Sequence, residues 1–255
     1  MNEIKQILLS SNLKELKLST MLKNYEVLAR QALENKWSYD DFLLELTQRE
    51  LSVRTENRLK RRLSEAKFPL MKTLESFDYE AAPGLDVRLI QDLKRCEYIS
   101  QKRNIILLGK SGTGKSHIAT GLAIEACRQG IRTRFVTGPG LANELIEAND
   151  EKMLSRTIQK YSRYGLLVVD ELGYVPFSKK GAELLFQVFA ERYERGAIVV
   201  TTNLGFADWT QIFGEATLTA ALLDRLTHKA HIITCDWDSY RLKETLKNKS
   251  QKKVR

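Results

Sequence analysis

The stretch Gly109-Lys110-Ser111-Gly112-Thr113-Gly114-Lys115-Ser116 fits the pattern GxxxxGK[ST] and follows the apolar run Ile105–Leu108. Behind it, apolar residues recur at helical spacing to about Cys127. A strand, a glycine-rich turn and a helix in this order are typical of a P-loop. The glycines let backbone N–H groups turn toward a polyphosphate at the positive end of the helix. The stretch therefore predicts a site for ATP, and the strand and helix around it argue against a chance match.

Two side chains of this motif have distinct expected tasks. Lys115 can bridge the terminal phosphates, and the hydroxyl of Ser116 can ligate Mg²⁺. ATP and Mg²⁺ are therefore the expected cofactors. The residues expected to contact the nucleotide are Gly109, Lys110, Ser111, Gly112, Thr113, Gly114, Lys115, Ser116 and His117.

A second apolar run, Leu166–Val169, ends in two carboxylates, Asp170 and Glu171. Acidic residues also follow ordinary strands, so the P-loop is what favours a chemical role here. Asp170 is expected to hold Mg²⁺ through water or through Ser116, and Glu171 is expected to orient and deprotonate the attacking water. Because a carboxylate base favours hydrolysis over transfer to a substrate hydroxyl, the pair predicts an ATPase.

Two further polar residues are candidates for the same chemistry. Asn203 follows the apolar run Ile198–Thr202 and could sense the γ-phosphate or position the water, although asparagine is also a common turn residue. Arg225 follows Asp224 on a predicted helix, Leu218–Thr227, where the alternative is a surface ion pair of little energetic value. The complete set of predicted catalytic residues is Lys115, Asp170, Glu171, Asn203 and Arg225.

The pattern of apolar residues along the chain predicts an α/β fold with a mostly parallel sheet. Short runs of apolar or β-branched residues alternate with amphipathic segments, as expected of parallel strands buried on both faces. The predicted strands are Ile105–Leu108, Arg132–Val136, Leu166–Val169, Ile198–Thr202 and His231–Thr234. A P-loop NTPase domain with helices flanking this sheet is therefore expected over residues 85–240.

The residues before this domain have a different pattern. No glycine or proline occurs from Leu13 to Leu63, and the apolar spacing is helical, which predicts a small all-α domain over residues 1–68. Ser38 and Asp41 have the spacing of a capping box that begins a long helix. Residues 69–84, with two prolines, are expected to be a linker, and residues 241–255 a basic tail.

Composition limits the compartment. No apolar run approaches the ~20 residues of a membrane span. The three cysteines are odd in number and lack CxxC spacing, so neither a disulfide framework nor a zinc site is indicated. A reducing cytoplasm and no membrane partner are expected.

The net charge of +9 is concentrated in two segments. Residues 49–72 hold eight Lys or Arg against three Glu, and residues 241–255 hold seven against one. Such patches suggest a polyanionic partner, with a solvated helix face as the alternative. The residues predicted to contact DNA are Arg54, Arg58, Arg61 and Arg62, which lie close together on the long helix.

The order of P-loop, Asp170-Glu171, Asn203 and Arg225 resembles the AAA+ superfamily, where these are Walker A, Walker B, sensor 1 and arginine finger. The chain is most similar to the IstB/DnaC-like branch and to the IstB ATPases of insertion sequences. The segments that carry this likeness are Phe77-Asp78-Tyr79, Pro83-Gly84-Leu85-Asp86, the P-loop, Leu172-Gly173-Tyr174, Leu222-Leu223-Asp224-Arg225-Leu226 and Trp237-Asp238-Ser239-Tyr240-Arg241.

The resemblance implies a function and partners. IstB-like proteins assemble around double-stranded DNA and recruit a transposase, which implies a transposition regulator that forms a homo-oligomer. It also implies that Arg225 reaches the ATP site of a neighbouring subunit. No helical lid is expected after Arg241, so no sensor 2 arginine is assigned.

Two other functions compete with this interpretation. A replicative helicase loader of the DnaC type shares nearly all of these motifs but handles single-stranded DNA. A small-molecule kinase keeps the P-loop but has no use for Glu171 and Arg225 together.

Overall fold

A computed structural model describes residues 3–240, which form two compact units divided between Arg61 and Arg62. The positions of the units relative to each other are not determined, so each is described separately. The predicted basic tail, with Arg241, lies outside the described residues.

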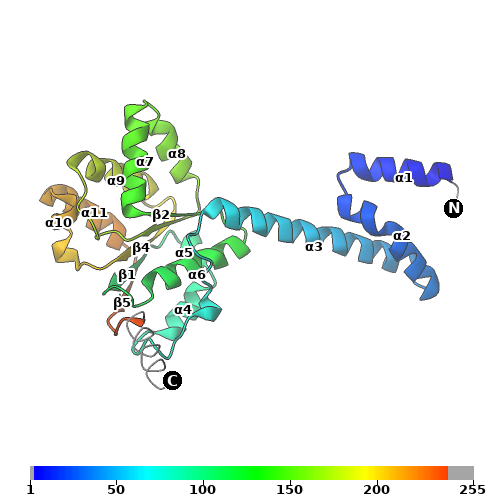
Figure 1. The fold of residues 1–255 in the computed structure, drawn as a ribbon, viewed down its shortest axis with the longest axis horizontal. Helices are drawn as coiled ribbons and strands as arrows, with labels where there is room; N and C mark the ends of the chain where they lie inside the picture. Colours follow the sequence, from blue (N-terminus) through cyan, green and yellow to red (C-terminus); the bar gives the residue numbers. More distant parts are fainter. Residues whose placement is uncertain (1–2, 241–255) are drawn as a thin grey trace, which may run out of the picture. The chain divides into compact units, whose positions relative to one another are not determined.

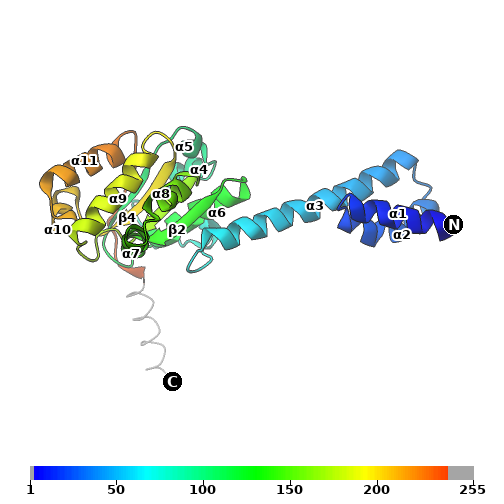
Figure 2. The same cartoon turned by 90° about the horizontal axis from the view of Figure 1, so that it is seen from above.

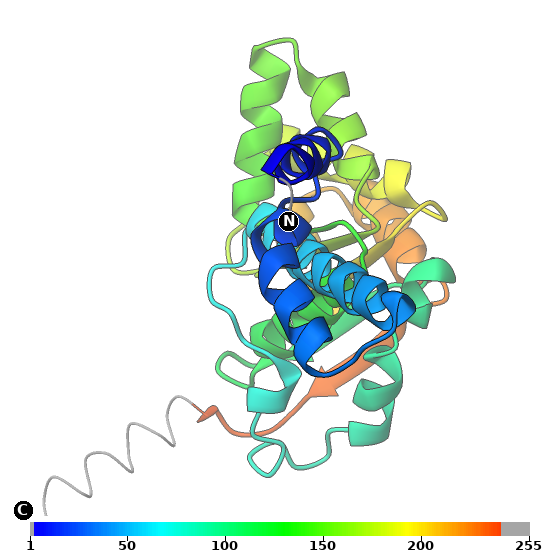
Figure 3. The ribbon, with the colours of Figure 1, turned by 90° about the vertical axis from the view of Figure 1, so that its right-hand side faces the viewer.

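The first unit consists of helices, drawn in blue in Figure 3. They are α1 (Glu3–Glu15), α2 (Ser19–Glu34) and most of α3 (Tyr39–Ala66). Its small core contains Leu13, Tyr25, Leu28 and Leu46. The predicted capping box precedes α3: the Ser38 hydroxyl accepts from the Asp41 N–H at 3.1 Å and donates to the Asp41 carboxylate at 2.7 Å. These contacts lower the pKa of Asp41 and fix where α3 begins.

The second unit contains a five-stranded sheet in the order β2-β3-β4-β1-β5, and every neighbouring pair is parallel. Its strands are β1 (Ile105–Gly109), β2 (Thr133–Thr137), β3 (Leu166–Asp170), β4 (Ala197–Thr202) and β5 (His231–Cys235). The predicted α/β fold with a parallel sheet is therefore confirmed. Because the strands are parallel, their carboxyl ends lie along one edge of the sheet, and β4 ends between β3 and β1.

Helices cover both faces of this sheet (Figures 1 and 2). They are α4 (Val87–Leu93), α5 (Glu97–Ser100), α6 (Lys115–Arg128), α7 (Gly138–Asp150), α8 (Leu154–Ser162), α9 (Lys179–Arg192), α10 (Thr210–Phe213) and α11 (Ala216–Thr227), with single turns η1 (Leu74–Ser76) and η2 (Phe206–Asp208). Alternate strand residues enter two separate cores. Ile105 and Leu107 pack in the core that includes α6, whereas Ile106 packs in the core formed with α7 to α11.

The segment 69–84, expected to be a linker, contributes to the core beside α6. Leu74, Phe77 and Ala82 are buried there. Gly121 of α6 admits this segment, since a Cβ at that position would stand 2.7 Å from the Leu74 side chain. Within residues 3–240, no helix has the length and apolar character needed to cross a bilayer.

Candidate functional site

The glycine-rich turn after β1 has the backbone geometry of a P-loop. Gly109, Gly112 and Gly114 all have φ values between +83° and +152°, a region that other residues rarely adopt. Side chains from elsewhere also press on the loop: a Cβ on Gly112 would meet the Ser239 hydroxyl at 2.1 Å, and one on Gly114 would meet the Phe77 ring at 2.7 Å. The glycines are therefore required both for backbone conformation and for packing. Helix α6 begins directly after the loop, so its first N–H groups face the loop.

Lys115 lies inside the loop, with only 5% of its surface exposed. Its ammonium donates to the carbonyl oxygens of Gly109 and Lys110, each at 2.6 Å. The Lys115 side chain is flexible, so its ammonium can turn from these carbonyl oxygens to a phosphate. A phosphate bound there would also lie at the positive end of α6.

Ser116 and Asp170 meet at the carboxyl edge of the sheet. The Ser116 hydroxyl donates to Asp170 Oδ1 at 2.8 Å, although the residues are 54 positions apart in the chain. Both were predicted to hold Mg²⁺, and the fold brings them together because β3 and β1 end at the same edge. Hydroxyl and carboxylate oxygens are ligands that Mg²⁺ prefers.

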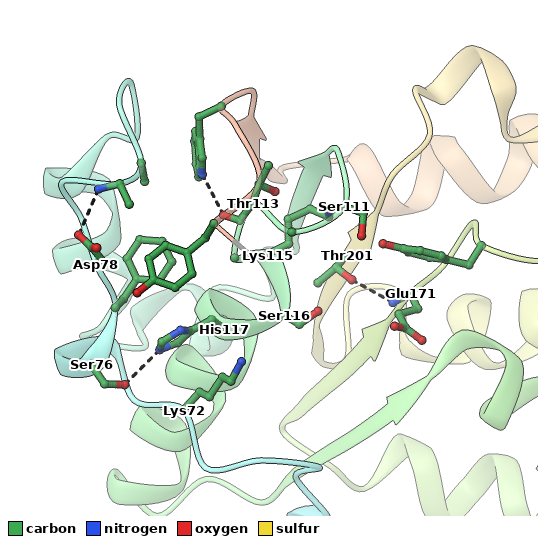
Figure 4. A pocket seen from close by; sticks show the side chains of 18 residues that line it. Lys72, Ser76, Asp78, Ser111, Thr113, Lys115, Ser116, His117, Glu171 and Thr201 are labelled. Atoms are coloured by element: carbon green, nitrogen blue, oxygen red, sulfur yellow. Dashed lines mark hydrogen bonds between the residues drawn. The ribbon is translucent and has the colours of Figure 1, made fainter. Parts of the chain in front are cut away.

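Thr201, which was not predicted as a site residue, contacts both carboxylate residues. Its hydroxyl donates to Asp170 Oδ1 and accepts from the backbone N–H of Glu171 at 2.9 Å. Figure 4 shows Thr201 beside Glu171 and Ser116. The signal in the sequence was the pair Thr201-Thr202, which is polar and ends an apolar strand. Only the next residue, Asn203, was predicted to belong to the site.

Lys115, Ser116, Glu171 and Thr201 line a cavity of about 340 Å³, whereas Asp170 is not among its lining residues (Figure 4). One part of its wall is the P-loop from Ser111 to His117, together with Glu171, Tyr174 and Thr201. The rest comes from residues 72–82 and from Trp237 and Tyr240. Neither Asn203 nor Arg225 is among the described residues that line this cavity.

The wall segment, defined here as residues 72–82, is attached to the P-loop helix through His117. The His117 Nε2 atom lies 2.8 Å from the Thr73 carbonyl oxygen and 3.2 Å from the Ser76 hydroxyl. Its ring also contacts the Phe77 ring edge-on, with centroids 5.2 Å apart. Burial lowers the pKa of His117. His117 therefore connects the loop to the segment that forms the outer wall of the cavity.

Residues 237–240 contact the other side of the P-loop through hydrogen bonds. The Trp237 indole donates to the Thr113 carbonyl at 3.0 Å, and the Tyr240 N–H donates to the Gly112 carbonyl at 3.0 Å. This segment, identified from the sequence only as part of a family likeness, therefore holds two carbonyl groups of the loop in place.

Asn203 is exposed beyond the end of β4. Its side-chain oxygen is 3.1 Å from the place where a Cβ on Gly173 would stand. It therefore lies beside the turn that follows Glu171, next to the cavity wall.

Arg225 lies near the amino ends of the strands, opposite the carboxyl ends where the P-loop lies. Asn104, which precedes β1, donates to the Leu226 carbonyl at 3.0 Å and accepts from the Ile198 N–H at 3.0 Å. These contacts fix the end of α11 at the amino ends of β1 and β4. A five-residue strand, about 16 Å long, therefore separates this end of α11 from the P-loop edge. The guanidinium donates to the Ala221 carbonyl at 2.8 Å and stacks 5.1 Å from the centre of the Phe186 ring.

The four arginines predicted to bind DNA have different surroundings. Arg54 is held within the first unit, where it donates to Glu50 at 2.7 Å and to the Lys17 carbonyl at 2.6 Å. Arg58 and Arg61 are exposed on α3. Arg62 belongs to the second unit, where its guanidinium lies near Gly130.

Comparison with known proteins identifies the family. A model of the family described as "IstB-like ATP binding protein" matches residues 11–248. The ATP-binding protein assigned to insertion sequence IS21 of Pseudomonas aeruginosa is 37% identical over 92% of this chain and 89% of its own length. The corresponding protein of insertion sequence IS5376 of Geobacillus stearothermophilus is 35% identical over 90% of this chain and 91% of its own length.

Solved structures agree on the fold. The AMPPCP-bound DnaA of Aquifex aeolicus matches with a TM-score of 0.56 at 19% identity, over 69% of this chain and 55% of that one. A DnaI structure matches with a TM-score of 0.54 at 18% identity, over 64% of this chain and 89% of that one. These neighbours and the P-loop confirm the predicted P-loop NTPase fold. The match to a family of ATP-binding proteins confirms the prediction of an ATPase. The chain belongs to the IstB-like family of ATP-binding proteins of insertion sequences.

Proposed function

We propose that this protein hydrolyses Mg²⁺-bound ATP at sites shared between subunits, assembles on double-stranded DNA and helps a transposase to use its target. The observation that carries the proposal is the group formed by Ser116, Asp170, Thr201 and Glu171 beside the P-loop. The insertion-sequence relatives supply the context of transposition.

The cavity suits a nucleoside triphosphate. Its P-loop end offers N–H groups, the start of α6 and the Lys115 ammonium to the phosphates. Its other end, formed by residues 72–82 with Trp237 and Tyr240, offers apolar and aromatic surface to the base and sugar. Binding at both ends would hold the γ-phosphate toward Glu171.

Ser116 and Asp170 fit a magnesium ion. Mg²⁺ usually takes only one or two protein oxygens and completes its shell with water and phosphate. Among residues 3–240, no cluster of three or more His, Cys, Asp or Glu side chains offers a closed protein cage, which agrees with such an open site. When bound, the ion would neutralise charge on the β- and γ-phosphate oxygens.

Glu171 is suited to activating water. Its carboxylate takes a proton as the water oxygen forms a bond to the γ-phosphorus, and the bond from phosphorus to the β-γ bridging oxygen breaks to leave ADP and phosphate. Lys115 and the loop N–H groups stabilise the charge on the transferred phosphoryl group.

Arg225 is the candidate for a second cation in the transition state. In its own subunit it lies at the sheet edge remote from the cavity, so it is better placed to serve a neighbour. Arginines supplied in trans raise the rates of other P-loop enzymes by about 10³–10⁵. A shared site would couple hydrolysis to assembly.

The test of the DNA step compares ATPase rates with double-stranded and single-stranded DNA of equal phosphate content. Double-stranded DNA should give the larger stimulation and should compete more strongly for binding at the same salt concentration. Preference for the single strand would contradict this function and favour a helicase loader.

A further inference from the structure

The end of β4 places a buried hydroxyl beside the acidic pair, Asp170 and Glu171. Thr201 is 1% exposed, and the register of the parallel sheet places it between β3 and the P-loop strand β1. From there its side chain reaches Asp170 and its backbone reaches the turn after β3.

Thr201 contacts three consecutive residues, the last residue of β3 and the first two of that turn. Its hydroxyl donates to the Asp170 carboxylate, and the same oxygen accepts from the Glu171 N–H. Its carbonyl oxygen accepts from the Leu172 N–H at 2.9 Å. One residue therefore contacts both the metal-binding carboxylate and the backbone that carries the base, and it shares the carboxylate oxygen with Ser116.

The backbone at Glu171 needs such support. Glu171 has φ = +60°, a left-handed conformation that non-glycine residues adopt only when surrounding contacts hold it. The hydrogen bond from its N–H to Thr201 is one such contact. Because the Cα–Cβ direction follows from this conformation, the position of the Glu171 carboxylate depends on it.

Resting on the proposed roles of Asp170 and Glu171, we propose that Thr201 is a positioning residue for ATP hydrolysis: its hydroxyl simultaneously orients the Mg²⁺-binding carboxylate and the catalytic base. The task needs a group that donates and accepts at once. Serine can do both, whereas valine, which has nearly the same shape, can do neither.

The chain offers a matched control on the same strand. Thr202 is also fully buried, but its hydroxyl accepts from the Leu204 N–H at 3.2 Å and, within residues 3–240, makes no hydrogen bond to Asp170 or Glu171. Thr201→Val and Thr202→Val therefore make the same chemical change in adjacent buried positions. Only the first removes the contacts to Asp170 and Glu171.

The experiment measures kcat and KM for ATP and, separately, the affinity for a fluorescent non-hydrolysable ATP analogue with Mg²⁺ and with EDTA. Thr201→Val should lower kcat by about 10–100-fold, as for other residues that orient metal ligands. It should weaken analogue binding several-fold with Mg²⁺ and leave binding in EDTA unchanged. Thr201→Ser should restore both readouts, and Thr202→Val should match the parent in the ratio of the two affinities.

Equal losses in Thr201→Val and Thr202→Val, or no rescue by serine, would overturn the inference. If Thr201→Val does not fold, Thr201→Ala and Thr201→Ser form the comparison, since they differ only in the hydroxyl. Asp170→Asn and Glu171→Gln separate this inference from the proposed function. Parent-like turnover in both would refute the proposed acidic site, whereas inactivity in both beside a parent-like Thr201→Val would refute only the role of Thr201.

Discussion

Lys115 provides the most direct test of the ATP site at the scale of single residues. Its buried ammonium lies within the loop, and alanine would remove its proposed charged hydrogen bonds to the ATP phosphates, each worth about 1.5–3 kcal/mol. Lys115→Ala should therefore lower ATP affinity by roughly 10²-fold or more. Titration with a fluorescent ATP analogue checks this. Lys179→Ala, an exposed charge-matched control on α9, should bind like the parent, and undiminished affinity in Lys115→Ala would refute the assignment.

Glu171 should affect turnover and not binding. Glu171→Gln keeps the size of the side chain but removes the base, so the hydrolysis rate should fall by roughly 10²–10⁴-fold while ATP remains bound. Phosphate release and analogue binding measured on the same sample separate the two effects. Glu183→Gln makes the same change at an exposed position of α9 and should hydrolyse ATP normally. Equal rates in Glu171→Gln and the parent would exclude the proposed base.

Residues within one motif were easier to predict than residues that meet through the fold. The spacing of glycines, Lys115 and Ser116 is local, and the strand and helix around it could be recognised from the same stretch. Thr201 escaped prediction because its importance depends on β4 lying between β3 and β1, and apolar runs do not specify strand order. Its contacts to Asp170 and Glu171 became visible only with the sheet assembled.

At the scale of elements, an ion pair fixes the wall segment beside α4. Lys94 donates to Glu75 at 2.5 Å, and this bond is the main cause that lowers the pKa of Glu75 from 4.5 to about 2. The side chains are 34% and 51% exposed, so solvent limits the contribution of the pair to at most about 1 kcal/mol.

The sign of the pH dependence follows from that lowered pKa. The stabilisation is complete above pH 4.5 and is lost as the pH falls through about 2, because the unfolded state takes up the proton first. Glu75→Gln should be less stable than the parent at pH 7, and the difference should shrink at pH 3. Urea unfolding at both values measures it. A difference in unfolding free energy that stays constant would contradict the role of the pair.

Helix α3 carries the prediction about DNA. The Arg58 side chain is exposed and, among the described residues, has no hydrogen bond or ion pair, so Arg58→Ala should report on DNA alone. The slope of log affinity against log salt should decrease by about one, with little dependence on DNA sequence. Arg30→Ala removes the same charge from α2 and should leave the slope unchanged. An unchanged slope in Arg58→Ala would mean that this position is only a solvated helix surface.

Elements were predictable where one periodicity extended along a segment. All five strands lie within about a residue of the predicted ranges. The uninterrupted apolar runs of β3 and β4 are buried throughout, whereas β2 and β5, the outer strands of the sheet, are only partly buried. The tertiary contacts of α3 were not predictable. Arg54 has the spacing of a DNA-binding stripe, yet its side chain donates to Glu50 and to the Lys17 carbonyl. The i,i+4 spacing of Glu50 and Arg54 is visible in the sequence, whereas the contact with Lys17 depends on the fold. A variant designed to test DNA binding should therefore keep Arg54, because its replacement would also remove contacts within the first unit.

At the scale of the whole molecule, the second unit carries two complementary features on opposite edges of its sheet. The ATP cavity lies at the carboxyl edge and Arg225 at the amino edge. In the proposed mechanism, a subunit with this arrangement supplies phosphate binding, metal ligands and base to its own ATP, and Arg225 of another copy supplies the additional cation.

The central claim, a site shared between subunits, is tested most directly by mixing two inactive variants. Arg225→Ala keeps an intact cavity but lacks the arginine, and Lys115→Ala lacks ATP binding but keeps the arginine. Each alone should hydrolyse ATP at least about 10³-fold more slowly than the parent. Their equimolar mixture on double-stranded DNA should recover a substantial fraction of the parent rate, because Lys115→Ala subunits complete the sites of their neighbours. No recovery in a mixture that demonstrably co-assembles by size would contradict the shared site.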